Sequence, residues 1–361
     1  MNSQIPTFSL FMEENDLEEL RSDIWNDLPL PATLHTSNST FDIDIAYRGS
    51  YTRTFRKRSY FIEFIEPDMF DGSREIHLNA EYRDPSLMRN KLSLDFFNHI
   101  GVLSPESYHI NLVRNGTPKG VYLLLESVDD LFLKNRGLPK GLIYYAVNNN
   151  ANFSLTRDGK KKRSRLSGYR QKVGDQSDDE SIRKLIEVIN TSSLQEFSRI
   201  IPGYLNVDKY LDWMVGTVCT MNNDGFTHNY ALYQNADTKL YEIIPWDFDA
   251  TLGRKVDGGK MAYDYVPIQG KESNFLCSRL LQTTEYRKCY KQKLEKLLET
   301  KFTASYMRDK IDTLHQLLRP HILNDPYKRR KIKEFDNEPE FIYQFIKDRS
   351  HFLREHFSEL D

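Results

Sequence analysis

The chain of 361 residues is long enough for two domains of ordinary size, or for one large domain with two lobes. Its 50 Lys and Arg residues nearly balance 52 Asp and Glu residues, and the formal net charge of -2 excludes a nucleic-acid binder that works by phosphate neutralisation alone. The mean hydropathy is -0.62. No apolar run reaches the roughly 18 residues that a membrane-spanning helix needs. The 21 Tyr and 21 Phe residues predict a sizeable folded core.

The three cysteines, Cys219, Cys277 and Cys289, form no CxxC pair and are odd in number. We therefore expect neither a disulfide framework nor a zinc site, and we expect a reducing compartment. The N-terminal stretch MNSQIPTFSLFMEENDLEEL has no basic segment before an apolar one, so it does not read as a secretion signal. These features predict an intracellular protein with no membrane and no nucleic-acid partner.

The first third of the chain is predicted to be mostly strands. Apolar and polar residues alternate over 41–48, which is typical of a half-buried strand, and a second strand is expected around 59–65. Residues 84–101 predict a helix with apolar positions four apart and a glycine at its end. An Asn-Gly turn within 108–125 predicts a hairpin. Residues 1–128 are therefore expected to form a β-rich lobe.

The remainder of the chain is predicted to be mostly helical. Residues 157–180 are strongly charged and are expected to form a solvated loop or insertion. Apolar positions at helical spacing predict two amphipathic helices, around 182–189 and 207–221. Further apolar stripes follow from about residue 278. Residues 129–361 are therefore expected to form a helical lobe.

The segment NNDGFTHN, residues 222–229, follows the second of these helices and carries the chemistry. A short hairpin over 230–244 comes next and ends in Pro-Trp-Asp-Phe-Asp. Protein kinases have the same chain order: helix, Asp-x-x-x-x-Asn loop, hairpin, then an acidic metal ligand. Asp224 and Asn229 have the required spacing, and Asp247 or Asp249 ends the hairpin. The alternative is a turn in which Asp and Asn serve the backbone only.

The residues themselves leave several functions open. A protein kinase and a small-molecule phosphotransferase would use the same Asp-x-x-x-x-Asn arrangement. A hydrolase could use Asp224, Asp247 and Asp249 as metal-binding carboxylates, and a non-enzymatic scaffold could keep the fold. His228 lies inside the loop, where a hydrogen-bonded histidine is a more ordinary role than a catalytic base.

Long motifs along the whole chain resemble the CotH kinase family. The segments that carry the resemblance are 45–50 (IAYRGS), 57–60 (KRSY), 77–82 (HLNAEY), 84–97 (DPSLMRNKLSLDFF), 222–233 (NNDGFTHNYALY) and 244–251 (IPWDFDAT). The resemblance implies an α+β, atypical two-lobed protein-kinase-like fold. It also implies ATP-dependent phosphorylation of serines in spore coat proteins, in a spore-forming Bacillus-type bacterium.

The resemblance also implies roles for individual residues. Asp224 falls on the family's catalytic Asp, and Asn229 on its metal-binding Asn. Asp247 falls on the Asp of the family's Pro-Trp-Asp motif, which serves metal binding and catalysis, and Asp249 completes that motif. The expected metal is Mg²⁺ or Mn²⁺. Lys57 matches a lysine assigned to the ATP phosphates, although the following position is Arg58, and the motif leaves open which of the two faces the nucleotide.

Other parts of the expected nucleotide site are less defined. Arg48 and Ser50 lie between two strands, where kinases have a glycine-rich loop, but no G-x-G-x-x-G is present. The backbone from Glu126 to Val128 is expected to meet adenine, in a cleft between the two lobes. The implied substrates are Ser-rich spore coat proteins, and the implied location is the mother cell cytoplasm, in association with the spore coat. Arg89 and Asn90 match the family but suggest no chemical role.

Overall fold

The computed structural model describes residues 4–361, so the first three residues of the N-terminal stretch lie outside the described part. The chain has a mixed α+β structure and forms two compact units, each built from three stretches. Unit 1 comprises the chain up to Lys91, Pro105–Ser127 and Asp309–Glu340. Unit 2 comprises Leu92–Ser104, Val128–Arg308 and Phe341–Asp361. One boundary falls beside residue 128, but the units do not follow the single division expected there, because both are assembled from distant stretches.

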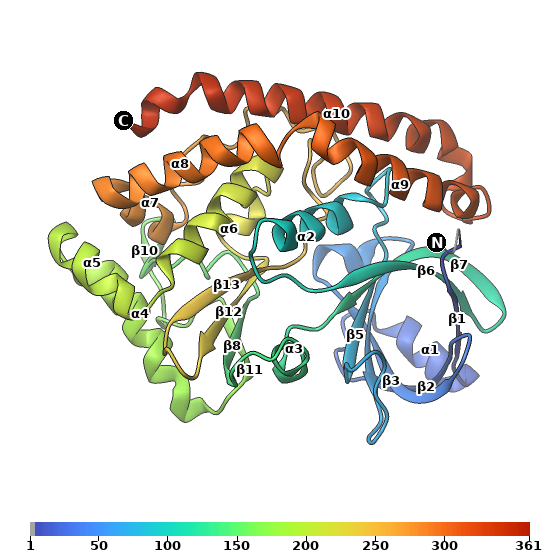
Figure 1. Cartoon of the computed structure of the whole chain (residues 1–361). Coiled ribbons are helices and arrows are strands. Elements are labelled where there is room, and N and C mark those ends of the chain that lie inside the picture. The colour runs from blue at the N-terminus through green and yellow to red at the C-terminus, as the bar shows by residue number, and fades with distance from the viewer. Residues whose placement is uncertain (1–3) are drawn as a thin grey trace. The chain divides into compact units, whose positions relative to one another are not determined.

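A closed seven-stranded sheet forms most of unit 1 (Figure 1). The strand order is β1-β2-β3-β4-β5-β7-β6, and β6 returns to pair with β1 in parallel, while the other neighbours are antiparallel. Alternate side chains of the strands point inward, and Leu34, Ile45, Ile62 and Leu78 are fully buried there. The strands are β1 (Thr7–Phe11), β2 (Leu30–His35), β3 (Thr40–Arg48), β4 (Ser59–Phe64), β5 (Glu75–Asn79), β6 (Ser107–Arg114) and β7 (Thr117–Glu126).

The strands and the hairpin predicted for this region are confirmed, whereas the helix predicted from residue 84 begins only at Arg89. The alternating segments are β3 and β4, and they pair with each other. The Asn115-Gly116 turn joins β6 to β7, with both residues in the left-handed region that this hairpin turn requires. Helix α1 (Glu14–Ser22) buries Leu17 and Leu20 in the same core. Helix α2 (Arg89–His99) begins in unit 1 and continues in unit 2, and Gly101 follows its end.

Unit 2 contains a four-stranded sheet in the order β11-β8-β12-β13. These strands are β8 (Gly141–Ala146), β11 (Tyr169–Val173), β12 (Tyr230–Asn235) and β13 (Tyr241–Pro245). The expected solvated loop at 157–180 is wrong in part, because β11 lies within it and pairs with β8, and because β9 (Thr156–Arg157) and β10 (Lys160–Lys161) form a small hairpin. Strand β11 is an edge strand with half-exposed side chains, so its sequence is polar.

Much of the rest of unit 2 is helical, as the apolar stripes predicted. Ten consecutive or near-consecutive residues of helix α6 (Val207–Thr220) are buried, and the helix ends at Met221, which has a left-handed conformation. None of the helices within residues 4–361 is long and apolar enough to cross a membrane. The other helices are α3 (Asp130–Asn135), α4 (Asp179–Thr191), α5 (Leu194–Ile200), α7 (Phe275–Gln282), α8 (Thr284–Thr300), α9 (Ala304–Ile322) and α10 (Ile332–Glu355), the last two being shared with unit 1.

Candidate active site

The turn that carries Asp224 follows directly from helix α6. After Met221 the chain enters a short 3-10 turn, Asp224–Phe226, where Gly225 N donates to Asn222 Oδ1 at 2.9 Å. The main-chain oxygen of Asp224 accepts from the N–H groups of Thr227 and His228, both at 3.0 Å. Asn223 Nδ2 donates to the carboxylate of Asp224 at 3.0 Å. The backbone of the turn is therefore fixed by local hydrogen bonds, and the half-buried carboxylate has a defined direction.

Asn229 and Asp247 lie side by side at the ends of the β12–β13 hairpin. Tyr230 pairs with Pro245, so the residues just outside this pair meet: Trp246 N donates to Asn229 O at 3.1 Å. Asn229 Nδ2 donates to the main-chain oxygen of Asp247 at 3.3 Å. Both residues have a positive φ, +60° and +57°. Among non-glycine residues, Asn and Asp adopt this conformation most readily, so these two residue types suit the bends at the ends of the hairpin.

Aromatic side chains anchor the segment around Asp247. Trp246 packs edge-on against Tyr145, with 5.3 Å between ring centroids. Phe248 is fully buried and packs edge-on against Phe97 of α2 at 4.9 Å. Trp246 and Phe248 are buried in unit 2, whereas Asp247 and Asp249, which alternate with them, are partly exposed. The packing of the two aromatic rings therefore leaves both carboxylates accessible.

The pKa of His228 depends on carboxylates from both parts of this site, the Asp224 turn and the end of the β12–β13 hairpin. Burial lowers the pKa of His228 below its ordinary value, and the carboxylates of Asp224 and Asp247 both oppose that shift. Both carboxylates are thus close enough to act on one imidazole. The ring Nδ1 also lies 3.2 Å from Thr227 Oγ1. The structure brings together Asp224, Asn229 and Asp247, and it gives His228 the hydrogen bond expected of a loop histidine.

The donor chemistry of this cluster fits a hard divalent cation. Asn229 uses its amide N–H₂ on Asp247, so its amide oxygen is the atom that can ligate a metal. No group of three or more His, Cys, Asp and Glu side chains placed to hold a metal occurs within residues 4–361. Magnesium differs from zinc in requiring only one or two carboxylates, since water and substrate phosphates complete its shell. Asn229 and Asp247 together offer one amide oxygen and one carboxylate, which is a ligand set of this kind.

Lys57, the residue expected at the nucleotide phosphates, is enclosed within unit 1. Its side chain has no exposed surface, and its ammonium donates to the main-chain oxygens of Ala80, at 2.9 Å, and Val121. The carboxylate of Asp325 lies 4.0 Å away. Burial lowers the pKa of Lys57 to about 8, and Asp325 opposes the shift. This is the environment of a structural lysine. The phosphate contact stays a prediction, and the geometry of Lys57 does not favour it.

The loop expected to replace a glycine-rich loop is the segment from Arg48 to Thr54. Arg48 donates to Asn79 Oδ1, and Ser50 is exposed. Arg53 is buried and donates to the main-chain oxygens of Gly49, at 2.6 Å, and Ile24, at 3.2 Å. Arg53 thus fixes the loop itself. A contact of Arg48 or Ser50 with a ligand stays a prediction.

The expected adenine-binding backbone lies where unit 1 ends and unit 2 begins. Glu126 N donates to Glu106 O at 3.0 Å, and Val128 N donates to the Tyr145 hydroxyl at 2.9 Å. Both N–H groups therefore already have acceptors within their own units. A contact of this backbone with adenine stays a prediction.

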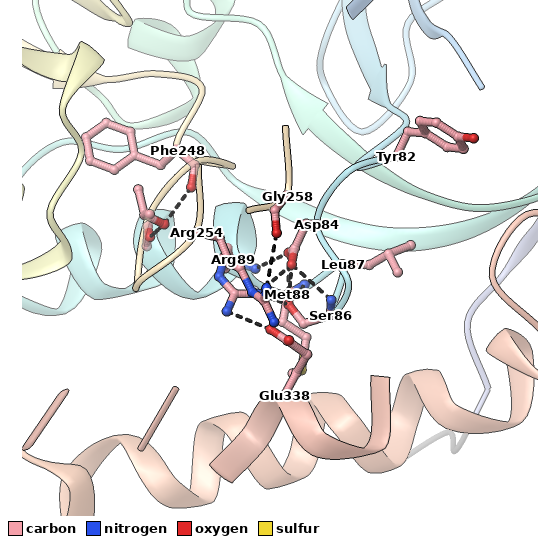
Figure 2. Close-up of polar contacts among 12 residues, drawn as sticks. Tyr82, Asp84, Ser86, Leu87, Met88, Arg89, Phe248, Arg254, Gly258 and Glu338 are labelled. Carbon is pink, nitrogen blue, oxygen red and sulfur yellow. Dashed lines mark hydrogen bonds and ion pairs between the residues drawn. The ribbon is translucent and has the colours of Figure 1, made fainter. Parts of the chain in front are cut away.

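Arg89, to which the sequence assigned no role, is the centre of a buried ionic network in unit 1 (Figure 2). Its guanidinium donates to Asp84 Oδ1 at 2.5 Å and to Ser86 Oγ at 3.0 Å, and it forms an ion pair with Glu338 of α10 at 2.6 Å. Burial raises the pKa of Asp84, but Arg89 and two backbone N–H groups lower it further, so the net shift is downward. Lys328 donates to the main-chain oxygen of Asp84 at 2.7 Å. The network is a structural one.

Comparisons with known proteins identify the family of this chain. The family model of the CotH kinase protein matches residues 45–353. The inner spore coat protein H of Bacillus subtilis (strain 168) is 50% identical over 360 residues, which cover 99% of each chain. The inner spore coat protein H-like protein of the same organism is 28% identical over 291 residues, 80% of this chain and 82% of that protein.

Two solved structures show a distant likeness. The Helicobacter pylori proinflammatory kinase CtkA has a TM-score of 0.38 and 10% identity, covering 83% of this chain and 94% of its own. The HipA toxin–antitoxin complex of Shewanella oneidensis MR-1 has a TM-score of 0.33 and 12% identity, covering 99% and 73%. The extent of the family match and of the identity to the Bacillus subtilis protein establishes that this chain belongs to the CotH kinase family.

Proposed function

We propose that this protein is an ATP-dependent protein kinase that phosphorylates serine residues of spore coat proteins. The observation that carries the proposal is the cluster of Asp224, Asn229 and Asp247, held at the end of α6 and at the mouth of the β12–β13 hairpin. Family membership supports the kinase assignment. The name of the Bacillus subtilis relative supports a role in the spore coat.

The chemistry follows from the charges of these residues. Bound to the Asn229 amide oxygen and the Asp247 carboxylate, Mg²⁺ or Mn²⁺ would neutralise the nucleotide phosphates. Asp224 would accept a hydrogen bond from the acceptor serine hydroxyl and take its proton as the new bond to phosphorus forms. Asp249 is close in sequence and would support the same metal.

The proposed substrates are Ser-rich coat proteins, and the proposed location is the mother cell cytoplasm, in association with the spore coat. We also propose that Arg48 and Ser50 contact the nucleotide, because they lie between two strands, where kinases have a glycine-rich loop. Lys57 has a smaller part in this proposal than the sequence suggested, because its ammonium is already bonded to main-chain oxygens.

The test compares two nearly isosteric variants, with radiolabelled ATP, Mg²⁺ and a Ser-rich coat protein. Asp224→Asn removes the proton acceptor only, so transfer should fall by roughly two to four orders of magnitude. Its nucleotide affinity should remain close to wild type. Asp247→Asn removes a metal ligand, so metal-dependent nucleotide binding should fall together with transfer. Calorimetry measures the binding.

Each alternative function gives a different result in the same assay. Release of inorganic phosphate without a labelled acceptor would indicate a carboxylate-metal hydrolase. Label in a small molecule but never in protein would indicate a small-molecule phosphotransferase. If Asp224→Asn transferred phosphate to the coat protein at the wild-type rate, the kinase assignment of this loop would be wrong.

A further inference from the structure

Lys271 lies on the segment that leads into α7, directly after a glycine that packs on the turn of Asp224. The turn from Pro267 to Gly270 is closed by a hydrogen bond between Gly270 N and Pro267 O at 3.0 Å. Gly270 has a φ of +77°, and a Cβ added to it would lie 2.6 Å from the ring of Phe226. Phe226 is fully buried and ends the 3-10 turn that begins with Asp224. The glycine therefore lets this segment pack directly against the catalytic turn.

The side chain of Lys271 lies in the field of Asp224 without forming a direct ion pair. Its ammonium is 4.4 Å from the centroid of the Tyr265 ring. Partial burial lowers the pKa of Lys271, and the Asp224 carboxylate opposes that shift, so Asp224 favours the charged form. In the part of the chain that the structure describes, no ion pair involves Lys271. The ammonium therefore interacts electrostatically with the Asp224 carboxylate while it contacts the Tyr265 ring.

The catalytic loop itself supplies no cation. Residues 222–229 contain no Lys and no Arg. Phosphoryl transfer spreads negative charge over three oxygens of the moving group, and positioned cations stabilise this charge. Arg157 also acts on the loop, through His228, but it is paired with Asp158 at 3.4 Å. Lys271, in contrast, interacts electrostatically with Asp224 and forms no ion pair among the described residues.

We propose that Lys271 is a catalytic residue that contacts the phosphoryl group during its transfer to serine. The proposal rests on the proposed kinase function. In this step the serine O–H proton moves to Asp224 and the serine oxygen forms a bond to the γ-phosphorus. The bond from that phosphorus to the bridging oxygen breaks, and ADP leaves with its electron pair. Lys271 neither gains nor loses a proton, and it stabilises the charge on the equatorial oxygens.

The experiment compares Lys271→Met and Lys271→Arg with Lys255→Met, an exposed lysine on the preceding part of the same segment. Lys271→Met should lower kcat roughly 10²- to 10³-fold, as loss of a transition-state donor does elsewhere. ADP affinity should change by less than about threefold, because the contact forms only in the transition state. Lys271→Arg should recover part of the loss, and Lys255→Met should match wild type.

A second readout separates catalysis from structure. Binding of ADP with Mg²⁺ and aluminium fluoride, which mimics the transferring phosphoryl group, should weaken in Lys271→Met while binding of ADP alone persists. If Lys271→Met fails to fold, Lys271→Gln is judged by the same two measurements. A kcat within about threefold of wild type, or an unchanged affinity for the fluoride complex, would overturn the inference.

Failure of this inference is distinguishable from failure of the proposed function. If wild type labels no protein acceptor, both fall. If Asp224→Asn abolishes transfer while Lys271→Met does not, the kinase function stands and only the role of Lys271 is rejected.

Discussion

Replacement of Arg89 by Met should strongly lower the free energy of unfolding of unit 1. The guanidinium is fully buried, and its two carboxylate partners, Asp84 and Glu338, have side chains that are 1% and 2% exposed. Met fills much of the same volume but leaves two carboxylates in the interior without their counter-charge. Removing one partner from a buried ion pair costs about 3–5 kcal/mol, because the remaining charge stays desolvated.

The matched control for this variant is Arg319→Met. Arg319 also pairs with a carboxylate of α10, that of Asp336, through two hydrogen bonds of 2.8 and 3.0 Å. Its side chain is 46% exposed, however, and exposed ion pairs contribute about 0.2–1 kcal/mol. The two variants thus remove the same side chain and differ mainly in burial.

Urea unfolding followed by circular dichroism measures the difference. Hydrogen exchange in the peptides of β5 and β7 assigns the loss to unit 1. With a slope of about 3 kcal/mol per molar urea, Arg89→Met should lower the unfolding midpoint by about 1–1.5 M, and Arg319→Met by at most about 0.3 M. Equal shifts for the two variants would refute the argument that burial of the network determines its contribution.

Three further outcomes are expected. Gly120→Ala should destabilise the protein by more than about 1 kcal/mol in thermal unfolding, because its φ is +79° and a Cβ there would lie 2.0 Å from Asp325 Oδ2. Burial lowers the pKa of His109 to about 4, so between pH 6.5 and 4 the unfolded chain binds a proton that the folded chain does not. Stability should fall by up to about 3 kcal/mol as the pH falls through this window, and less in His109→Gln; equal pH slopes in calorimetry would contradict this. Chelation by EDTA should weaken nucleotide binding of the wild type but change little in Asp247→Asn, whose affinity should already be low with Mg²⁺ present.

Patterns confined to short stretches predicted the fold well. The alternation that identifies β3 and the helical stripe of α6 are local consequences of burial on one face. The Asn-Gly turn and the order of α6, loop and hairpin are local as well, so Asn229 and Asp247 could be expected to meet. The polar edge strand β11 was missed, because an edge strand with half-exposed faces has no apolar signature.

Features that depend on distant segments could not be predicted. Nothing in the sequence near Lys57 indicates that Asp325 packs beside it, and its match to a family motif suggested a nucleotide contact instead. Glu338 lies far from Arg89 along the chain, so the sequence around each residue could not indicate that the two form a buried ion pair. The packing of Gly270 on Phe226, which brings the segment of Lys271 to the turn of Asp224, is a contact for which one glycine in the sequence gives no signal.

The assembly of unit 1 from three separate stretches has a consequence for biosynthesis. The ribosome delivers Arg89 early, but Glu338 and Asp325 emerge only after nearly all of unit 2 has been made. At elongation rates of about 5–20 residues per second, this delay is about 12–50 seconds. During that time Arg89 lacks Glu338, and Lys57 lacks Asp325. Unit 1 also lacks its third stretch, Asp309–Glu340. The nascent protein therefore has to remain soluble with its first unit unfinished, and truncation before residue 340 would leave it permanently in that state.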